Sequence, residues 1–583
     1  MSQSVNADHG WPQRSWGLAC AGVSVGLALY FLTSTGERWQ MTESPIRLSL
    51  ATFLAVAGIA FAFVVERTRL PLSIIFAGIA GLVMASIVYW SGGPDDWGNA
   101  DPLRLACGAI AVAVAAPLFQ AWRDAGAQRS SQILYATVHD RAWTNVVLWF
   151  ASWAFVGIVW LLTALLSELF GLIGITIIKE LMREEWFAPV LTGGAFGGAV
   201  GLLRDREKIL GTLQRVVTTV LSVLAPVLGV GLVVFLLALP FTGLKPLWDA
   251  TSATTPILIT CVIGALILAN AVIGDTPEDE AKLPVLRWGA MALGAAMLPL
   301  GIIAALSTGL RIDQHGLTPD RLWALVACIV ACAYGIAYLV ALARRRMGWA
   351  ADVRPANLKL AFGLCGLALL LSTPFVSFNA LSTRDQVSRL TRGKIAPDKF
   401  DWTALKFDFG GAGKKALNQL AKNGKTDAIR KAALAAQKIE NRWDARSAQE
   451  KLASRETLDA RLIIVPQKTP LPDDLRTRLV EWDACATDGA CVLQYSAGAT
   501  SAIVVRSNCE TCEPATIALE KREKGWTDSN QPQFVGSKFV DDKARDANRK
   551  RLAAAIARGE IEVRTIKRRQ VYVEGKPVGQ EFE

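Results

Sequence analysis

The chain has 583 residues, of which 52% are hydrophobic and 19% are charged, and its mean hydropathy is +0.31. A water-soluble protein of this length carries closer to a quarter charged residues, so the composition argues against an ordinary soluble enzyme. Residues 380–583 contain 37 basic and 28 acidic residues, and they therefore hold +9 of the net charge of +11. The first two thirds of the chain are nearly neutral and apolar, which predicts a membrane-embedded region followed by a soluble one.

Eleven apolar segments of the length needed to cross a membrane follow one another before residue 379. A membrane helix takes roughly 20 mainly apolar residues, because the hydrocarbon core is about 30 Å thick and a helix rises about 1.5 Å per residue. None of the segments has a charge near its middle, and Trp or Tyr often lies at the ends, where aromatic rings favour the headgroup layer. The predicted spans are Trp16–Thr33, Ile46–Val65, Leu70–Trp90, Leu103–Trp122, Trp143–Leu165, Phe187–Leu203, Val216–Leu239, Pro256–Ile273, Trp288–Ser307, Leu322–Ala343 and Leu358–Phe378.

Three stretches of this region allow more than one interpretation. Phe187–Leu203 is short and rich in glycine, which favours close helix packing through small residues, with a broken helix lining a cavity as the alternative. Leu169–Ile178 is too short to span, so we expect an interfacial or re-entrant segment. Trp16–Thr33 lacks a small-residue cleavage site after its apolar run and is interpreted as a retained helix.

The distribution of basic residues predicts the orientation in the membrane. With the N-terminus inside, the inner loops hold 17 of the 25 basic residues that precede Ala380, and the outer loops hold 8. The predicted organisation is a cytoplasmic N-terminus at residues 1–15, a transmembrane helical domain at 16–378 and a soluble extracytoplasmic α+β domain at 379–583.

Helical and strand patterns alternate in the soluble part, which is typical of an α+β domain with a small sheet. The basic clusters at Arg549–Arg551 and Lys567–Arg569 indicate a solvated face or contact with anionic lipid headgroups rather than nucleic acid, because the domain is expected outside the cytoplasm. The predicted helices are Gly410–Asn423, Asp427–Glu456 and Asp541–Arg558. The predicted strands are Ala460–Pro466, Ala490–Ser496, Thr500–Arg506 and Pro514–Glu520, with further strands around a turn at Glu574–Gly575.

Four of the ten cysteines lie in the soluble domain, and the other six lie in the spans. An even number in an oxidising compartment predicts disulfides, and we favour Cys485–Cys491 and Cys509–Cys512. A four-thiolate zinc site, a redox pair at Cys509–Cys512 and free thiols are the alternatives.

The chain contains no nucleotide-binding loop, Rossmann glycine pattern, HExxH helix or GxSxG elbow, and only three histidines. No cofactor and no metal is therefore expected. In the predicted outer loop Arg311–Trp323, Thr318 suits a helix N-cap and Pro319 suits the first helical position.

Five residues are weak candidates for binding a ligand. Arg311, His315 and Arg321 collect in that same outer loop and are candidates for binding a phosphate or carboxylate headgroup, although capping and interfacial anchoring explain the loop better. Glu168 is a carboxylate at a membrane border. Asn270 lies near the end of its span, where hydrogen bonding between helices is the favoured interpretation.

Several strings together resemble one family of bacterial multi-span proteins. They are ELFGLIGITIIKEL at Glu168–Leu181, LPFTGLKPLW at Leu239–Trp248, RIDQHGLTPDRLWAL at Arg311–Leu325, STPFVSFNALSTRDQVSRL at Ser372–Leu390 and DFGGAGKKALNQLA at Asp408–Ala421. In content and order they are similar to domain-of-unknown-function family 4153, over roughly Trp143 to Ala421. The resemblance implies an inner-membrane location and no established activity, so it supplies no catalytic residues.

Three functions remain open from the sequence. The first is a non-enzymatic envelope scaffold or sensor that presents an external domain to a periplasmic protein or ligand. The second is a transporter or lipid-handling protein, and the third is a membrane-embedded transferase, which lacks a recognisable acid–base pair. The expected partners are the lipid bilayer together with anionic headgroups or a periplasmic protein.

Overall fold

The computed structural model describes residues 13–34, 44–93, 97–127, 132–243, 253–439, 442, 458, 462–467, 469–481, 491–506, 515–522, 525–528, 542–561, 569–573 and 576–582. The chain divides into two compact units, Met1–Gln437 and Lys438–Glu583, which are described separately below.

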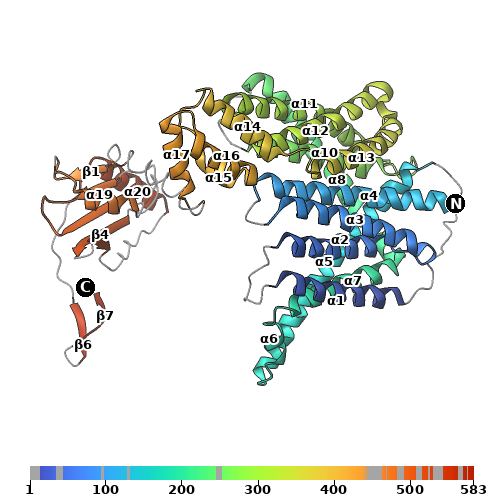
Figure 1. Ribbon diagram of the computed structural model, residues 1–583, viewed down its shortest axis with the longest axis horizontal. Coiled ribbons are helices and arrows are strands. Elements are labelled where there is room, and N and C mark those ends of the chain that lie inside the picture. The colour runs from blue at the N-terminus through green and yellow to red at the C-terminus, as the bar shows by residue number, and fades with distance from the viewer. Residues whose placement is uncertain are drawn as a thin grey trace. The chain divides into compact units, whose positions relative to one another are not determined.

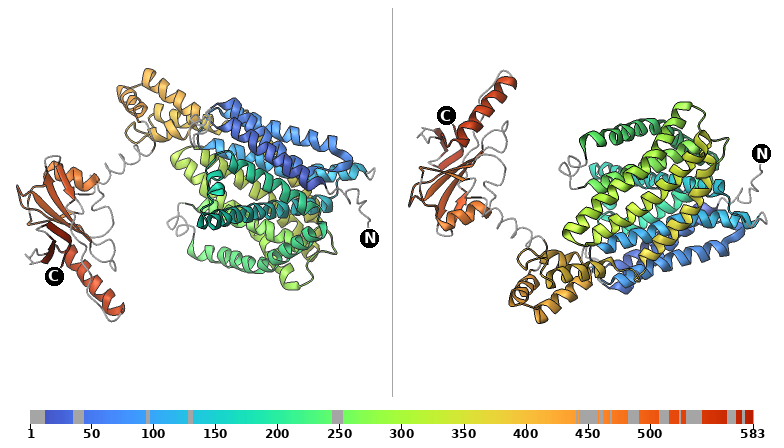
Figure 2. Two further views of the ribbon diagram at one scale, coloured as in Figure 1. Left: turned by 90° about the horizontal axis from the view of Figure 1, so that it is seen from below. Right: turned by 90° about the horizontal axis from the view of Figure 1, so that it is seen from above.

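The first unit is a bundle of long apolar helices (Figures 1 and 2). Within the described residues, eleven helices are long and apolar enough to cross a membrane, which confirms the predicted spans and defines a multi-pass membrane protein. They are α1 (Gln13–Thr33), α2 (Pro45–Val64), α3 (Leu70–Ser91), α4 (Ala100–Ala127), α5 (Tyr135–Leu172), α7 (Phe187–Arg204), α8 (Glu207–Thr242), α10 (Thr254–Ile273), α11 (Pro284–His315), α12 (Pro319–Arg345) and α13 (Ala350–Ser372).

Three of the predicted elements differ from the structure. The helix predicted at Asp427–Glu456 ends at Gln437. The last span ends at Ser372 and not at Phe378, because Pro374 disfavours helical backbone at Thr373, which is extended with ψ 161°. The segment Leu169–Ile178 is not one re-entrant element. Its first residues finish α5, a turn with Gly174 at φ +80° follows, and α6 (Ile177–Leu181) begins a new short helix.

Glycines explain how α1 and α7 pack against each other. A Cβ on Gly22 would lie 2.0 Å from the carbonyl oxygen of Gly193, and a Cβ on Gly197 would lie 2.1 Å from that of Leu18. Only glycine allows backbones to approach this closely. The glycine-rich sixth span is one continuous helix, so close packing is confirmed and the broken helix is not observed.

The bundle has two ends, called the N face and the α14 face. The N face is the end where α1 begins, α2 ends and α3 begins. The α14 face is the opposite end, where α3 ends, α4 begins and α13 is followed by α14 (Phe378–Thr391).

Four helices cover part of the α14 face (orange in Figure 1). After α14 come α15 (Trp402–Phe407), α16 (Gly410–Asn423) and α17 (Asp427–Gln437), around a small core of their own that includes Leu405, Leu417 and Ile429. They join the spans through polar contacts, since the backbone N–H of Asn99 donates to the carbonyl of Asp408 at 2.8 Å. The sequence predicted α16 with the observed bounds.

The second unit contains a mixed sheet in the order β1-β2-β3-β4-β5, in which only the β1–β2 pair is parallel. Its core includes Leu475, Leu493, Val504 and Trp526, each at most 3% exposed. A separate two-stranded sheet, β6–β7, follows α20. The four strands predicted between Ala460 and Glu520 correspond to β1, β2, β3 and β4, and the helix predicted at Asp541–Arg558 corresponds to α20. The elements are β1 (Leu462–Val465), α19 (Asp473–Glu481), β2 (Cys491–Gln494), β3 (Ser501–Arg506), β4 (Ala515–Arg522), β5 (Gly525–Asp528), α20 (Asp542–Ala557), β6 (Arg569–Val573) and β7 (Lys576–Phe582).

Candidate functional site

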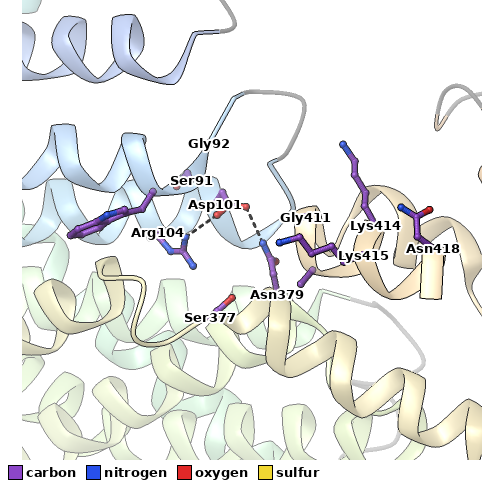
Figure 3. A pocket seen from close by; sticks show the side chains of 12 residues that line it. Ser91, Gly92, Asp101, Arg104, Ser377, Asn379, Gly411, Lys414, Lys415 and Asn418 are labelled. Atoms are coloured by element: carbon purple, nitrogen blue, oxygen red, sulfur yellow. Dashed lines mark hydrogen bonds and ion pairs between the residues drawn. The ribbon is translucent and has the colours of Figure 1, made fainter. Parts of the chain in front are cut away.

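A cavity of about 520 Å³ opens on the α14 face, and it is named here the α3–α16 cavity. Four regions of the chain form it: the end of α3, the start of α4, the beginning of α14 and the first turns of α16 (Figure 3). Its lining residues are Trp90, Ser91, Gly92, Asp101, Arg104, Ser377, Asn379, Gly411, Ala412, Lys414, Lys415 and Asn418.

Asp101 anchors one wall of this cavity. Its carboxylate accepts hydrogen bonds from the backbone N–H of Gly98 at 2.8 Å, from Nδ2 of Asn379 at 2.9 Å and from Arg104 at 3.2 Å. Asp101 and Arg104 are both buried, and a buried carboxylate of this kind needs such donors to offset its desolvation. Asp101 therefore holds α4 and α14 together, and its charge is already balanced by Arg104.

The close approach at this wall depends on Gly98. A Cβ there would lie 2.5 Å from both the carbonyl oxygen of Asp408 and the backbone nitrogen of Gly410. The loop before α4 can thus reach the start of α16 only because it has no side chain at this position.

Cationic groups dominate the opposite wall. Lys414 and Lys415 both lie in the first turns of α16, and Figure 3 shows Lys415 pointing toward the Asp101–Asn379 pair. Because Arg104 balances Asp101, Lys415 adds a positive charge to the described lining that this carboxylate does not offset. This charge favours an anion.

The start of α16 adds donors to the same wall. The helix has no side-chain cap, whereas the neighbouring α14 and α15 are capped by Ser377 and Asp401. The first backbone N–H groups of a helix have no partner inside it, and Gly411 and Ala412, which occupy these positions, line the cavity. A helix N-terminus with free donors and a positive dipole end is suited to an anion.

Among the described residues, the lining contains no histidine and no cysteine, and its carboxylate and hydroxyl groups are engaged in structural hydrogen bonds. Its single carboxylate, Asp101, is fully engaged, and the Ser91 hydroxyl donates to the carbonyl of Ile87 at 2.9 Å. The Ser377 hydroxyl accepts from the backbone N–H of Ala380 as a helix cap. Nor does any cluster of three His, Cys, Asp or Glu side chains suited to a metal occur in the described part of the chain.

Arginines on the N face have a different use. Arg123 donates to the carbonyl of Val64 at 2.6 Å and pairs with Glu66 at 2.8 Å, and Arg354 donates to the carbonyl of Ile273 at 2.7 Å. The last carbonyls of a helix have no partner within it and carry the negative end of the dipole. These arginines therefore close helix ends.

The predicted residues of the outer loop lie on the α14 face but not in the cavity. Arg321 donates to the carbonyl of Gly316 at 2.7 Å, and His315, which ends α11, is exposed and accepts through its own carbonyl from Gln386. Thr318 accepts from the N–H of Arg321 as an N-cap, as predicted, with Pro319 following it. Arg311 is half-buried near Arg321. Arg321 thus closes the end of α11.

The two remaining candidates, Glu168 and Asn270, lie on different helices, α5 and α10. Glu168 is exposed on α5. Asn270 occupies the centre of a buried polar network, where it donates to the hydroxyl of Tyr338 at 2.8 Å and accepts from Asn357 at 2.7 Å and from Tyr135 at 3.4 Å. It therefore connects α10 to α12, α13 and α5.

Of the four cysteines predicted to form disulfides, only Cys491 lies among the described residues. It begins β2 and is 1% exposed. Cys485, Cys509 and Cys512 lie outside the described residues, so the predicted pairing stays a prediction.

Sequence reasoning missed the residues that form the cavity. Asp101 and Asn379 are 278 positions apart, and no local pattern indicates that they meet. One local signal did exist, because GGAGKK at Gly410–Lys415 places small residues and two lysines at the start of a predicted helix.

The fold and site define a multi-pass helical membrane protein with a polar cavity at one end of its bundle. The family described as "Domain of unknown function (DUF4153)" matches residues 53–417, and the chain belongs to that family. The match contains every lining residue of the cavity except Asn418 and excludes the second unit. No curated protein and no solved structure matches the chain.

Proposed function

We propose that this protein is a non-enzymatic protein of the bacterial inner membrane that binds an anionic ligand in the α3–α16 cavity. The observation that carries the proposal is the charge of the lining, where Lys415 points toward a carboxylate that Arg104 already balances. The uncapped start of α16 supports the same choice of ligand. A transferase is disfavoured because the described lining holds no histidine and its one carboxylate, Asp101, is engaged by three donors.

We further propose that the N-terminus is cytoplasmic and that the α14 face and the second unit are periplasmic. The excess of basic residues in the loops of the N face supports this orientation. The disulfides predicted among the four cysteines of the second unit would fit an oxidising compartment. In this orientation the cavity receives its ligand from the periplasm or the outer leaflet, and the protein acts as a scaffold or sensor toward a periplasmic partner.

The test uses the purified full-length protein in a non-ionic detergent with inorganic phosphate as the probe. A ligand that binds only the folded state raises the midpoint of thermal unfolding by an amount that grows with its concentration. We expect phosphate to raise the midpoint more than chloride at equal ionic strength. The double variant Lys414→Gln/Lys415→Gln should lose this difference.

Lys422→Gln is the matched control, because Lys422 lies on the same helix and does not line the cavity. It should respond to phosphate as the unchanged protein does. Equal responses in all three proteins would contradict anion binding in the cavity.

A further inference from the structure

We propose that the anionic ligand is a glycerophospholipid with a net negative, hydroxyl-bearing head group, whose phosphate occupies the α3–α16 cavity and whose acyl chain lies between α2 and α3. This inference rests on the proposed function and names its ligand class. It joins the cavity to a second, apolar feature of the same end of the bundle.

The second feature is a groove of about 330 Å³ between α2 and α3, which is named here the α2–α3 groove. Its walls are mainly apolar and include Ile46, Leu50, Leu82 and Tyr89. Ile46 and Leu82 are each 61% exposed, so they offer apolar surface on the outside of the bundle. Because both helices are membrane spans, that surface faces hydrocarbon.

The two hydroxyl groups in the groove do not make it polar. Ser49 donates to the carbonyl of Pro45 at 2.6 Å, and Ser86 donates to the carbonyl of Leu82 at 2.8 Å. Both hydroxyls are therefore satisfied within their own helices. The groove suits a hydrocarbon chain.

Trp90 lines both the groove and the cavity. It is the penultimate residue of α3, at the end of a span, where the aromatic rings of membrane proteins lie at headgroup level. An apolar wall at hydrocarbon depth thus continues into a cationic wall at headgroup depth. A lipid with an anionic head group matches this arrangement, because its apolar acyl chain continues into a negatively charged phosphate. A free phosphate would occupy the cavity only and would leave the groove without a role.

Asn379 indicates what the head group carries besides its phosphate. Its side chain is 6% exposed and lines the cavity, and its Oδ1 has no hydrogen-bond partner among the described residues. A buried acceptor without a partner costs free energy, so a donor from the ligand would stabilise it. A head-group hydroxyl is such a donor, while Lys415 and the first N–H groups of α16 face the phosphate.

The experiment measures lipid retention by native mass spectrometry on the full-length protein in a non-ionic detergent. The probes are dioleoylphosphatidylglycerol, which is anionic and carries hydroxyls, and dioleoylphosphatidylcholine, which is zwitterionic. We expect preferential retention of the phosphatidylglycerol, and about a tenfold loss of it in Lys414→Gln/Lys415→Gln, the effect of losing one charge-assisted hydrogen bond.

Two tryptophan variants on α3 separate the groove from the rest of the lipid-facing surface. Ser86→Trp fills the groove, and Ile79→Trp places the same side chain on a lipid-exposed position, 58% exposed, outside it. We expect Ser86→Trp to lose phosphatidylglycerol about tenfold, because a displaced acyl chain forfeits about 0.8 kcal/mol per buried methylene. It should keep its stabilisation by inorganic phosphate, which shows that it is folded, and Ile79→Trp should behave as the unchanged protein.

Different outcomes overturn different claims. If the unchanged protein retains phosphatidylglycerol no better than phosphatidylcholine while phosphate still stabilises it, the ligand is a soluble anion and the lipid inference is wrong. If Ser86→Trp retains phosphatidylglycerol fully, the acyl chain does not lie in the groove and the inference is wrong. If Ile79→Trp loses as much lipid as Ser86→Trp, the bound lipid is not held in the groove and the inference is also wrong. If the lysine variant retains both probes, anion binding in the cavity fails as well.

Discussion

On the N face, arginines donate to the last carbonyls of neighbouring spans, whereas on the α14 face Lys414 and Lys415 border a cavity. Both faces carry basic residues, so a positive charge alone does not show what a cation does. The difference lies in what each cation contacts. A guanidinium that closes a helix end stabilises the fold, whereas we propose that an ammonium beside the uncapped start of α16 binds a ligand.

The largest expected effect is on the N face. Arg123 is 5% exposed, and Arg123→Ala would leave Glu66 without its ion pair and would remove one of the two donors to the carbonyl of Val64, the other being the Ser73 hydroxyl. Breaking a buried pair in this way costs about 3 kcal/mol of the free energy of unfolding. Denaturant titration in micelles measures this. Lys208→Ala, an exposed position on the same face, should change stability by less than about 0.5 kcal/mol.

The next effect concerns the packing of the spans themselves. Gly22→Ala would place a Cβ 2.0 Å from the backbone of α7, and separating two packed helices costs about 2 kcal/mol. Gly17→Ala, on the same helix with open space around it, should leave stability unchanged or raise it slightly. Equal losses in the two variants would show that α1 and α7 do not meet through this contact.

A smaller effect is expected in the second unit. The hydrogen bond from Lys521 to Asp474, at 2.7 Å, holds the pKa of that carboxyl below its usual value of 3.8. A carboxyl with a lowered pKa stabilises the fold above its unfolded pKa, and this contribution is lost as the pH falls below about 3.8. Asp474→Asn should remove that pH dependence and slightly speed the hydrogen exchange of β4 amides at neutral pH. Unchanged exchange would show that this exposed pair contributes nothing.

The smallest effect on stability is expected at the cavity. Lys414→Gln/Lys415→Gln should leave the unfolding free energy in ligand-free detergent within about 0.5 kcal/mol of the unchanged protein, because residues placed for a ligand are not needed for the fold. The same denaturant titration tests this. A loss comparable to that of Arg123→Ala would make the lysines structural and remove the contrast between the two faces.

The sequence predicted the elements better than the site, for a physical reason. Apolar runs near 20 residues and the Thr318–Pro319 cap are local signals, so the eleven spans and the start of α12 were predictable. The end of α13 was missed because apolar residues continue past Ser372, whereas Pro374 disfavours helical backbone at Thr373. The cavity was missed because it depends on the contact of Asp101 with Asn379, which only tertiary packing creates. The role of Arg321 likewise depends on the carbonyl that it meets.

One cysteine-labelling experiment tests both the side of the membrane on which the α14 face lies and the occupancy of the cavity by an anion. Asn418→Cys places a thiol on the rim and leaves both lysines intact, and Lys422→Cys places one on the same helix outside the lining. After subtraction of the labelling of the unchanged protein, both should react in spheroplasts with a membrane-impermeant maleimide. Inorganic phosphate should slow the reaction at position 418 and not at 422. Reaction only after permeabilisation would contradict the periplasmic placement, and equal rates with and without phosphate at position 418 would contradict anion binding.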